Sequence, residues 1–219
     1  MIFSENMKVN LRIEEERDRR ASEYVTREAF WNVYNPGCCE HYVLHRFRKD
    51  PDFVPELTYV AEIGSKIVGH IMYSRGKIQK DGGGAIETAV FGPVSVLPEY
   101  QGTGIGGALI ELTMEKAARM GFKIVTITGN PQYYSRFGFV SGAQKGIRYT
   151  GAPEGEDFPY FLVKELENGA LEGVSGCFED PPGYITDPEE VDRFDKCFPP
   201  KQKLRLPGQL GYQQEANHE

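Results

Sequence analysis

A glycine-rich turn that runs straight into an amphipathic helix constrains this chain more than any other feature. The segment VLPEYQGTGIGGALIELTMEKAARMG covers residues 96–121. Its glycines, Gly102, Gly104, Gly106 and Gly107, allow the backbone to approach a ligand without interference from side chains. The first amides of the helix have no partner within the helix, and the helix dipole is positive at this end. The segment therefore predicts a binding site for a phosphate or pyrophosphate.

Three interpretations of this turn compete. The first is a plain connection that starts a helix. The second is dinucleotide binding, because Gly102, Gly104 and Gly107 satisfy GxGxxG, but that fold also needs an acidic residue at the end of the next strand. The next strand, KIVTITGN, contains no Asp or Glu, which argues against a nicotinamide-dependent oxidoreductase. The third interpretation is the pattern Gln/Arg-x-x-Gly-x-Gly/Ala, which residues 101–106 satisfy.

Composition narrows the class of protein. The chain has 219 residues, of which 40% are hydrophobic and 26% charged, as in an ordinary globular domain. No apolar run approaches the roughly 18 residues of a membrane span, and the first residues lack an apolar signal segment, so we expect a cytoplasmic protein without a membrane partner. The net charge of -7 argues against nucleic acid as a partner.

A metal site is the alternative interpretation of the run CCEHYVLH. It places His41 and His45 four residues apart, directly after Cys38 and Cys39. The Glu that follows the first His in zinc proteases is missing, and the cysteines are too close to the histidines for a zinc finger. We therefore expect no metal, and free thiols at all four cysteines.

Periodicity predicts an α/β fold with a mixed sheet. Apolar residues that recur every three or four positions indicate helices, and alternation of apolar and polar residues indicates strands. Gly92 and Pro93 fall inside one long expected strand, where a continuous ladder does not tolerate them, and predict a bulge. The expected strands are 8–13, 57–63, 67–74, 86–97, 123–128 and 159–167, and the expected helices are 17–31, 38–48, 104–120 and 131–137.

Two parts of the chain differ in character. Residues 1–167 carry the periodic elements and form the expected domain. Six of the fourteen prolines in the chain lie within residues 168–219, and the hydrophobic periodicity fades there. We expect this C-terminal extension to form a hairpin and an arm packed on the domain.

A second motif, GNPQYYSRFGF at residues 129–139, joins the glycine turn in a family resemblance. Asn130, Tyr134, Gly138 and Phe139 match a short helix that follows the fifth strand of the Gcn5-related N-acetyltransferase (GNAT) superfamily. FGPVSVLPEYQGTGIG resembles the fourth strand and pyrophosphate arm of that superfamily. Over residues 8–166 the chain is similar to its YhbS-type predicted members. The resemblance implies a central, mostly antiparallel sheet, splayed at strands 4 and 5 and flanked by about four helices.

The resemblance implies acetyl-CoA as cosubstrate. In that family the splayed strand pairs with the pantetheine arm, the glycine turn holds the pyrophosphate, and an Asn or Asp holds the pantetheine chain. An amide near Val96 would polarise the thioester carbonyl. The implied acetyl-CoA site consists of Val94, Val96, Gln101, Gly102, Thr103, Gly104, Ile105, Gly106 and Asn130.

Tyr134 aligns with the usual proton donor of the family. A phenol with a pKa of about 10 is protonated at neutral pH and can protonate a leaving thiolate. The alternative is that Tyr134 packs beside Tyr133, Phe137 and Phe139 as a core aromatic residue. The expected activity is transfer of an acetyl group from acetyl-CoA to a primary amine of a small molecule or peptide. The competing function is a non-catalytic acyl-CoA binding or sensing module.

The general base and the acceptor stay open at this point. The Glu that histone-modifying members carry on the fourth strand aligns with Val90. Glu87, Glu62 and a water relay are the alternatives, and the sequence does not choose among them. A homodimer is equally open. A loop that could attract a cationic amine carries Glu154, Glu156 and Asp157.

Overall fold

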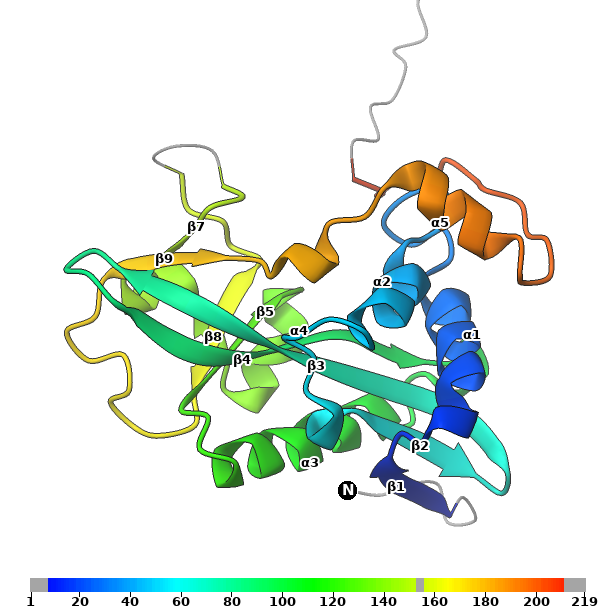
Figure 1. Cartoon of the computed structure of the whole chain (residues 1–219), viewed down its shortest axis with the longest axis horizontal. Helices are drawn as coiled ribbons and strands as arrows, with labels where there is room; N and C mark the ends of the chain where they lie inside the picture. The colour runs from blue at the N-terminus through cyan, green and yellow to red at the C-terminus, as the bar shows by residue number, and fades with distance from the viewer. Residues whose placement is uncertain (1–7, 153–155, 211–219) are drawn as a thin grey trace, which may run out of the picture.

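A nine-stranded mixed sheet is the centre of the structure, a computed structural model that describes residues 8–152 and 156–210. The strands follow the order β1-β2-β3-β4-β5-β8-β6, and β9 pairs with β3 and β7 (Figure 1). Most pairs are antiparallel, while β4–β5 and β7–β9 are parallel. The expected mixed α/β sheet is confirmed. Within the described residues no helix is long and apolar enough to cross a membrane.

Five α-helices accompany the sheet in the described part of the chain, against about four expected, and the additional one, α5, belongs to the C-terminal extension. The helices are α1 Arg19–Phe30, α2 Glu40–Phe47, α3 Ile105–Arg119, α4 Pro131–Tyr134 and α5 Pro188–Asp195. The strands are β1 Val9–Ile13, β2 Tyr59–Ile63, β3 Lys66–Lys80, β4 Ala85–Val96, β5 Ile124–Thr128, β6 Val140–Ser141, β7 Ile147–Tyr149, β8 Phe161–Glu165 and β9 Gly176–Glu179.

Helices α1 and α3 cover opposite faces of the β3–β4 hairpin (Figure 1). Gly69 faces α3, since a Cβ there would lie 3.0 Å from Ile105. The next residue, His70, pairs with Ser95, whose hydroxyl lies 2.9 Å from that of Thr26 on α1. Because neighbouring residues of a strand point to opposite faces, the two helices enclose the hairpin between them. The main hydrophobic core forms around these elements.

Strand β4 contains the bulge that Gly92 and Pro93 predict. The β3–β4 register shifts between Ile71 and Tyr73. Two residues of β4, Gly92 and Pro93, therefore stand opposite a single residue of β3, Met72. This is the two-against-one arrangement of a β-bulge, which bends the strand that carries the extra residue.

The pairing of β4 with β5 is short. Ala89 pairs with Val125 and Val90 with Thr126, and the ladder goes no further toward the bulge. From there to Val96 the edge of β4 that faces away from β3 has no strand beside it among the described elements. The splay that the family resemblance implies is confirmed.

The C-terminal extension contributes to both ends of the molecule. Strand β9 pairs with residues Lys77–Lys80 of β3 and with β7, so this segment adds one strand to the main sheet and not the expected hairpin. Helix α5 packs on α2, with the rings of His45 and Phe194 4.5 Å apart. Figure 1 shows α5 and the chain after it beside α1 and α2, in orange and red.

Candidate functional site

A cleft of about 580 Å³ lies between the open edge of β4, the start of α3 and helix α4. Eight of the ten residues in the predicted site line it: Val94, Val96, Gln101, Gly102, Gly104, Ile105, Gly106 and Tyr134. The tertiary structure thus brings together two motifs that are about thirty residues apart in the sequence. Thr103 and Asn130 are the two predicted residues that do not line the cleft.

The start of α3 presents a row of free amides to this cleft. Gly102 and Gly104 have positive φ angles of 75° and 92°, which glycine adopts without strain. The first intrahelical bond runs from the amide of Ala108 to the carbonyl of Gly104, at 3.0 Å. No amide of residues 102–107 donates a hydrogen bond to any described residue. These donors, together with the positive end of the helix dipole, make a site for an anion.

Two side chains brace the turn. Thr103 Oγ1 donates to the carbonyl of Tyr100 at 2.6 Å, which turns its side chain away from the cleft and onto the preceding backbone. Gln101 Nε2 donates to the carbonyl of Val96 at 3.1 Å. The turn is thereby joined to the end of β4.

The edge of β4 presents backbone groups to the cleft at alternate residues. The amide of Leu97 donates to Val68 on β3, at 2.9 Å. Backbone groups alternate in direction along a strand, so those of Val96 and Val94 point away from β3 and toward the cleft. The contact of Gln101 with the Val96 carbonyl comes from this open side. An extended ligand can therefore pair with β4 here as an added strand.

Tyr134 combines a packed ring with a free hydroxyl. Its ring centroid lies 5.9 Å from Phe91, 5.9 Å from Phe139 and 4.9 Å from Tyr133, so the ring belongs to an aromatic cluster. Gly129 makes room for it, because a Cβ there would lie 2.3 Å from the ring. The hydroxyl has no hydrogen-bond partner among the described residues, and Tyr134 lines the cleft.

The surroundings of Tyr134 keep its phenol protonated. Burial raises the pKa of Tyr134 above its usual value, and the nearby phenols of Tyr133 and Tyr34 raise it further. Tyr34 lies in the loop between α1 and α2. A raised pKa keeps the proton on Tyr134 at neutral and moderately basic pH.

Asn130 caps helix α4. Its Oδ1 accepts from the amide of Gln132 at 2.9 Å, and Pro131 occupies the first helical position. Asn and Pro at these positions are typical of a helix start. The contact fixes the direction of α4, the element that carries Tyr133 and Tyr134.

Sequence reasoning missed two charged residues of the cleft, Glu111 and Arg136. The helical spacing places Glu111 and Glu115 four residues apart on the side opposite the apolar stripe, which predicts a solvent-facing Glu111. Arg136 follows α4, where its Nε donates to the carbonyl of Tyr133 at 2.9 Å and its guanidinium lies 4.5 Å from the ring centre of Tyr133. A basic residue two positions after the expected proton donor was the available signal for a cation near the anion site.

The two carboxylates considered as general base lie elsewhere. Glu62 accepts from Arg12 Nε at 3.1 Å, and Glu87 pairs with Arg75 at 2.9 Å. Neither lines the cleft, and Val90 is buried in the core. In the acidic loop, Glu156 and Asp157 are exposed, while Glu154 lies outside the described residues.

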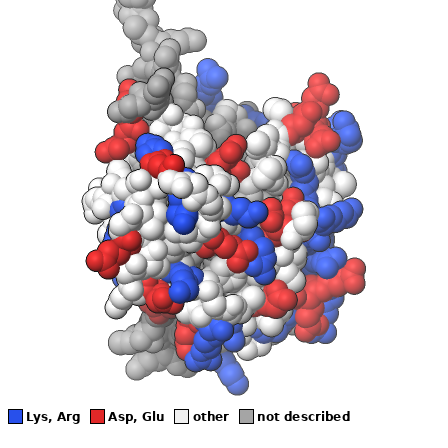
Figure 2. Space-filling model, turned by 60° about the vertical axis from the view of Figure 1, so that its left-hand side comes forward, with Lys and Arg blue, Asp and Glu red and all other residues white. Residues whose placement is uncertain are grey.

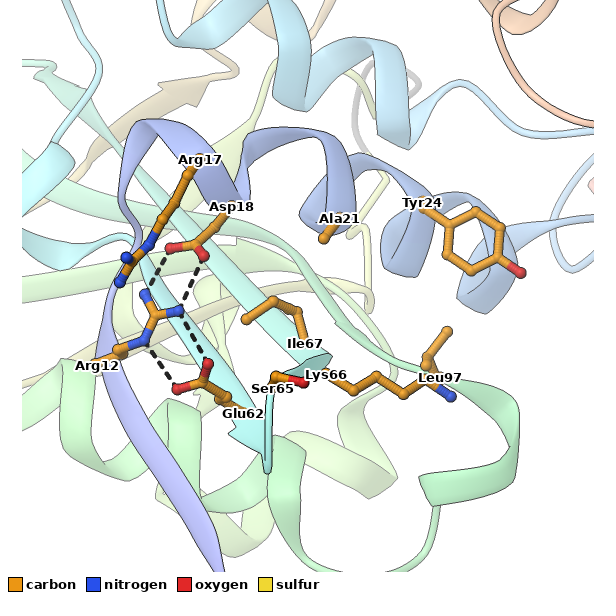
Figure 3. A pocket seen from close by; sticks show the side chains of 10 residues that line it. All are labelled: Arg12, Arg17, Asp18, Ala21, Tyr24, Glu62, Ser65, Lys66, Ile67 and Leu97. Atoms are coloured by element: carbon orange, nitrogen blue, oxygen red, sulfur yellow. Dashed lines mark hydrogen bonds and ion pairs between the residues drawn. The ribbon is translucent and has the colours of Figure 1, made fainter.

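A second hollow, of about 650 Å³, lies beside β1 and the start of α1 (Figure 3). At one end the guanidinium of Arg12 lies between the carboxylates of Asp18 and Glu62 and binds both. At the other end Lys66 pairs with Glu99 at 3.0 Å. Because these charges already neutralise one another, the hollow has few unpaired charged groups with which to bind a ligand.

The two histidines of the run CCEHYVLH make separate contacts with carboxylates. His45 Nδ1 lies 2.9 Å from Glu23, whereas His41 Nε2 lies 3.2 Å from Asp195 on the extension. Burial raises the pKa of the Cys38 thiol and keeps it protonated. Across residues 8–152 and 156–210, no three His, Cys, Asp or Glu side chains gather as they would around a metal ion. On the face drawn in Figure 2, basic and acidic side chains are interspersed.

Fold and cleft together define an acyl-CoA-type transferase fold, and the family comparison agrees. Residues 55–141 match the family model described as acetyltransferase (GNAT) domain. This match spans the glycine turn, the open edge of β4 and the motif of Tyr134. Over residues 55–141 the chain therefore matches the Gcn5-related N-acetyltransferase superfamily.

Among curated proteins, the chain is similar to two from Escherichia coli K12. It is 35% identical over 91 residues to the uncharacterized N-acetyltransferase YjhQ, which covers 42% of this chain and 50% of YjhQ. It is 27% identical over 139 residues to the uncharacterized N-acetyltransferase YhbS, which covers 63% of this chain and 78% of YhbS. The chain thus spans half the length of the first of these relatives.

Two solved structures share the fold. Escherichia coli YhbS in complex with CoA superposes with a TM-score of 0.70 at 23% identity, covering 84% of this chain and 96% of that one. A GNAT family acetyltransferase from Brucella melitensis in complex with acetyl-CoA superposes with a TM-score of 0.62 at 25% identity, covering 81% of this chain and 99% of that one.

Proposed function

We propose that this protein is an N-acetyltransferase that moves an acetyl group from acetyl-CoA to a primary amine of a small molecule or peptide. The observation that carries the proposal is the row of free amides at residues 102–107, in a cleft that Val94 and Val96 of β4 and Tyr134 also line. Relatives whose structures hold CoA and acetyl-CoA support the same ligand.

Each part of the cleft suits one part of acetyl-CoA. The free amides receive the pyrophosphate, since fixed N–H donors and the helix dipole favour a negative charge. Arg136 supplies a positive charge at the same cleft. The pantetheine arm, which has amides of its own, pairs with the exposed backbone of Val94 and Val96. Asn130, at the start of α4, helps to hold the pantetheine chain.

In the proposed reaction the acceptor amine attacks the thioester carbonyl directly. A C–N bond forms and the carbonyl oxygen becomes a tetrahedral oxyanion, which the amide near Val96 stabilises. Collapse breaks the C–S bond, and the departing thiolate takes its proton from Tyr134. The amine must also lose a proton. Neither Glu62 nor Glu87 lines the cleft, whereas Glu111 does, so the candidates for this step are the Glu111 carboxylate and a water relay.

The competing function is an acyl-CoA binding module without chemistry. Such a module needs the free amides but not a phenol in the cleft lining whose hydroxyl bonds to no described residue. A hydroxyl that no described protein group engages is available to a ligand in the cleft. The free hydroxyl of Tyr134 therefore favours catalysis.

Titration calorimetry with acetyl-CoA, CoA and NAD, followed by thiol release over a panel of amines, tests the proposal. We expect binding of both CoA species, none of NAD, and thiol release that depends on an amine. Binding without thiol release on any amine would support the module instead. Absence of CoA binding would exclude both. A cytoplasmic location, a homodimer and the division at residue 167 stay predictions.

A further inference from the structure

The carbonyl of Gly92 accepts a hydrogen bond from a residue nearly one hundred positions later in the chain. Tyr184, in the 3-10 turn Pro182–Tyr184 of the C-terminal extension, donates its hydroxyl to this carbonyl at 3.0 Å. Gly92 is the first residue of the bulge that frees the edge of β4. We propose that Tyr184 is a positioning residue of the acyl-CoA site, which holds the bulge in the shape that presents Val94 and Val96 to the ligand.

The bulge creates the need for this contact. In a bulge the extra residue leaves the ladder, so its backbone groups lose their cross-strand partners. The hydroxyl of Tyr184 replaces one such partner for Gly92. The same hydroxyl lies 3.4 Å from Ser74 Oγ on β3, so it bridges the two strands near the point where their register shifts.

The position of Tyr184 is fixed by packing against α2. Its ring centroid lies 4.6 Å from that of Phe47, which is fully buried in a cluster that includes Met72, the residue opposite the bulge. Gly183 allows this approach, because a Cβ there would lie 2.5 Å from the Phe47 ring. Burial also raises the pKa of Tyr184, so the phenol stays a hydrogen-bond donor.

The hydrogen bond from Tyr184 to Gly92 acts on the cleft through the backbone between Gly92 and Val94. Val94, which lines the cleft, follows Gly92 by two positions, and Pro93 between them restricts the backbone. A shift of the Gly92 carbonyl therefore moves the edge with which the pantetheine arm is proposed to pair. Tyr184 lies outside residues 55–141, so the family match does not contain this part of the site.

The inference rests on the proposed function, and the variant Tyr184→Phe tests it against the control Tyr42→Phe. Tyr42 also joins the extension to the domain through its hydroxyl, which donates to Glu190 at 2.7 Å, but it does not touch the bulge. Calorimetry with CoA and steady-state kinetics with acetyl-CoA are performed on the full chain, with thermal unfolding measured alongside.

We expect Tyr184→Phe to raise the Kd for CoA and the KM for acetyl-CoA by roughly three- to tenfold, the range set by one lost hydrogen bond. Tyr42→Phe should lower the unfolding temperature to a similar degree and leave both constants at the wild-type value. Equal constants in wild type and Tyr184→Phe, or an equal increase in both variants, would overturn the positioning role.

A second variant, Gly183→Ala, keeps the hydroxyl and displaces the turn that carries it. The added methyl group meets the ring of Phe47, so the turn must move away from α2 and Tyr184 must move with it. We expect the same increase in Kd for CoA, and wild-type affinity would contradict the inference. Failure of the wild-type protein to bind CoA would overturn the proposed function, whereas wild-type binding with unaffected variants overturns only the role of Tyr184.

Discussion

Tyr134 shows how one residue serves packing and chemistry at once. The two interpretations of its motif, a core aromatic and a proton donor, describe different parts of the same side chain. The ring fills an aromatic cluster with Phe91 and Phe139, while the hydroxyl has no partner among the described residues. The packing raises the pKa of the phenol and limits the directions in which the hydroxyl can point.

Replacement of Tyr134 by Phe is expected to lower kcat by roughly 10²- to 10⁴-fold, the usual contribution of a positioned proton donor. CoA affinity should change little, because the ring and its packing remain. Thiol-release kinetics and calorimetry measure the two effects. Because the pKa of Tyr134 is raised, we expect no loss of wild-type rate from deprotonation of this residue as pH rises from 7 to about 10.

Tyr133→Phe is the matched control, since its phenol lines the same cleft one residue earlier. We expect this variant to retain wild-type kcat. A large fall in kcat for Tyr133→Phe together with normal turnover for Tyr134→Phe would assign the proton donor to Tyr133.

The start of α3 and the edge of β4 make the site together. The helix supplies amides that its own geometry leaves unpaired, and the strand supplies backbone that its bulge frees from β5. Both features depend on glycine conformations: Gly104 at φ 92° begins the helix, and Gly92 lies in the bulge.

The anion site predicts a difference between two glycines with the same φ. Gly104 and Gly83 both have φ of 92° and open space around the Cβ position, but Gly83 lies in the β3–β4 turn. Substitution by Ala is expected to cost about 1–2 kcal/mol of unfolding free energy at either site. Only Gly104→Ala should weaken CoA binding, by roughly tenfold, as for one lost bond to a charged group. Equal CoA affinity in the two variants would remove the helix start from the site.

A buried ion network joins β1, α1, α2 and β3. Arg48 binds Glu14 at 2.7 Å and Glu23 at 2.6 Å, and His70 Nε2 lies 3.4 Å from Glu14. Burial alone would raise the pKa of Glu14, but His70 and Arg48 outweigh it and hold the pKa well below the usual range of a glutamate.

A carboxylate whose pKa is lower in the folded than in the unfolded state stabilises the fold at pH values above its unfolded-state pKa of about 4.3. This stabilisation is lost as the pH falls below that value toward the folded-state pKa. Glu14→Gln should therefore lower the unfolding free energy by about 2–3 kcal/mol above pH ~5, and the gap to wild type should narrow below pH ~4. Urea unfolding across pH 3–7 measures both. Glu99→Gln, at an exposed pair, serves as control, and a pH-independent gap for Glu14→Gln would contradict the expectation.

The C-terminal extension is bound to the domain at several places. Strand β9 pairs with β3, Tyr184 reaches the bulge, and Asp195 binds the fully buried guanidinium of Arg27 at 2.5 and 3.1 Å. Arg27 also lies over the ring of Trp31, at 4.2 Å. A buried arginine on α1 thus depends on a carboxylate nearly 170 residues later.

Asp195→Asn is expected to lower the unfolding free energy by about 3 kcal/mol, because it removes the nearer counter-charge of a buried cation and leaves only the 3.8 Å pair with Glu28. Lys203→Met removes an exposed pair with Asp192 and should cost less than about 1 kcal/mol. Urea denaturation of the full chain compares the two variants. A loss for Asp195→Asn no larger than that of Lys203→Met would show that the extension is held mainly by its other contacts.

Local signals determined the elements and the positions of the motifs. Residues 101–106 predict a helix start with free amides because the glycine conformations and helix geometry are properties of neighbouring residues. Gly92 and Pro93 predict the bulge for the same reason. The family resemblance carried by these motifs supplied the fold, a mostly antiparallel sheet splayed at strands 4 and 5.

Contacts between residues far apart in the sequence follow from the folded structure alone. Glu111 lines the cleft although its helical position suggests solvent, and Glu62 and Glu87 bind arginines away from the cleft although their positions suggest a base. Arg27 is buried because Asp195 neutralises it, and Tyr184 holds the bulge because α2 supports its ring. Such pairings depend on distances between remote segments, which spacing along the sequence does not encode.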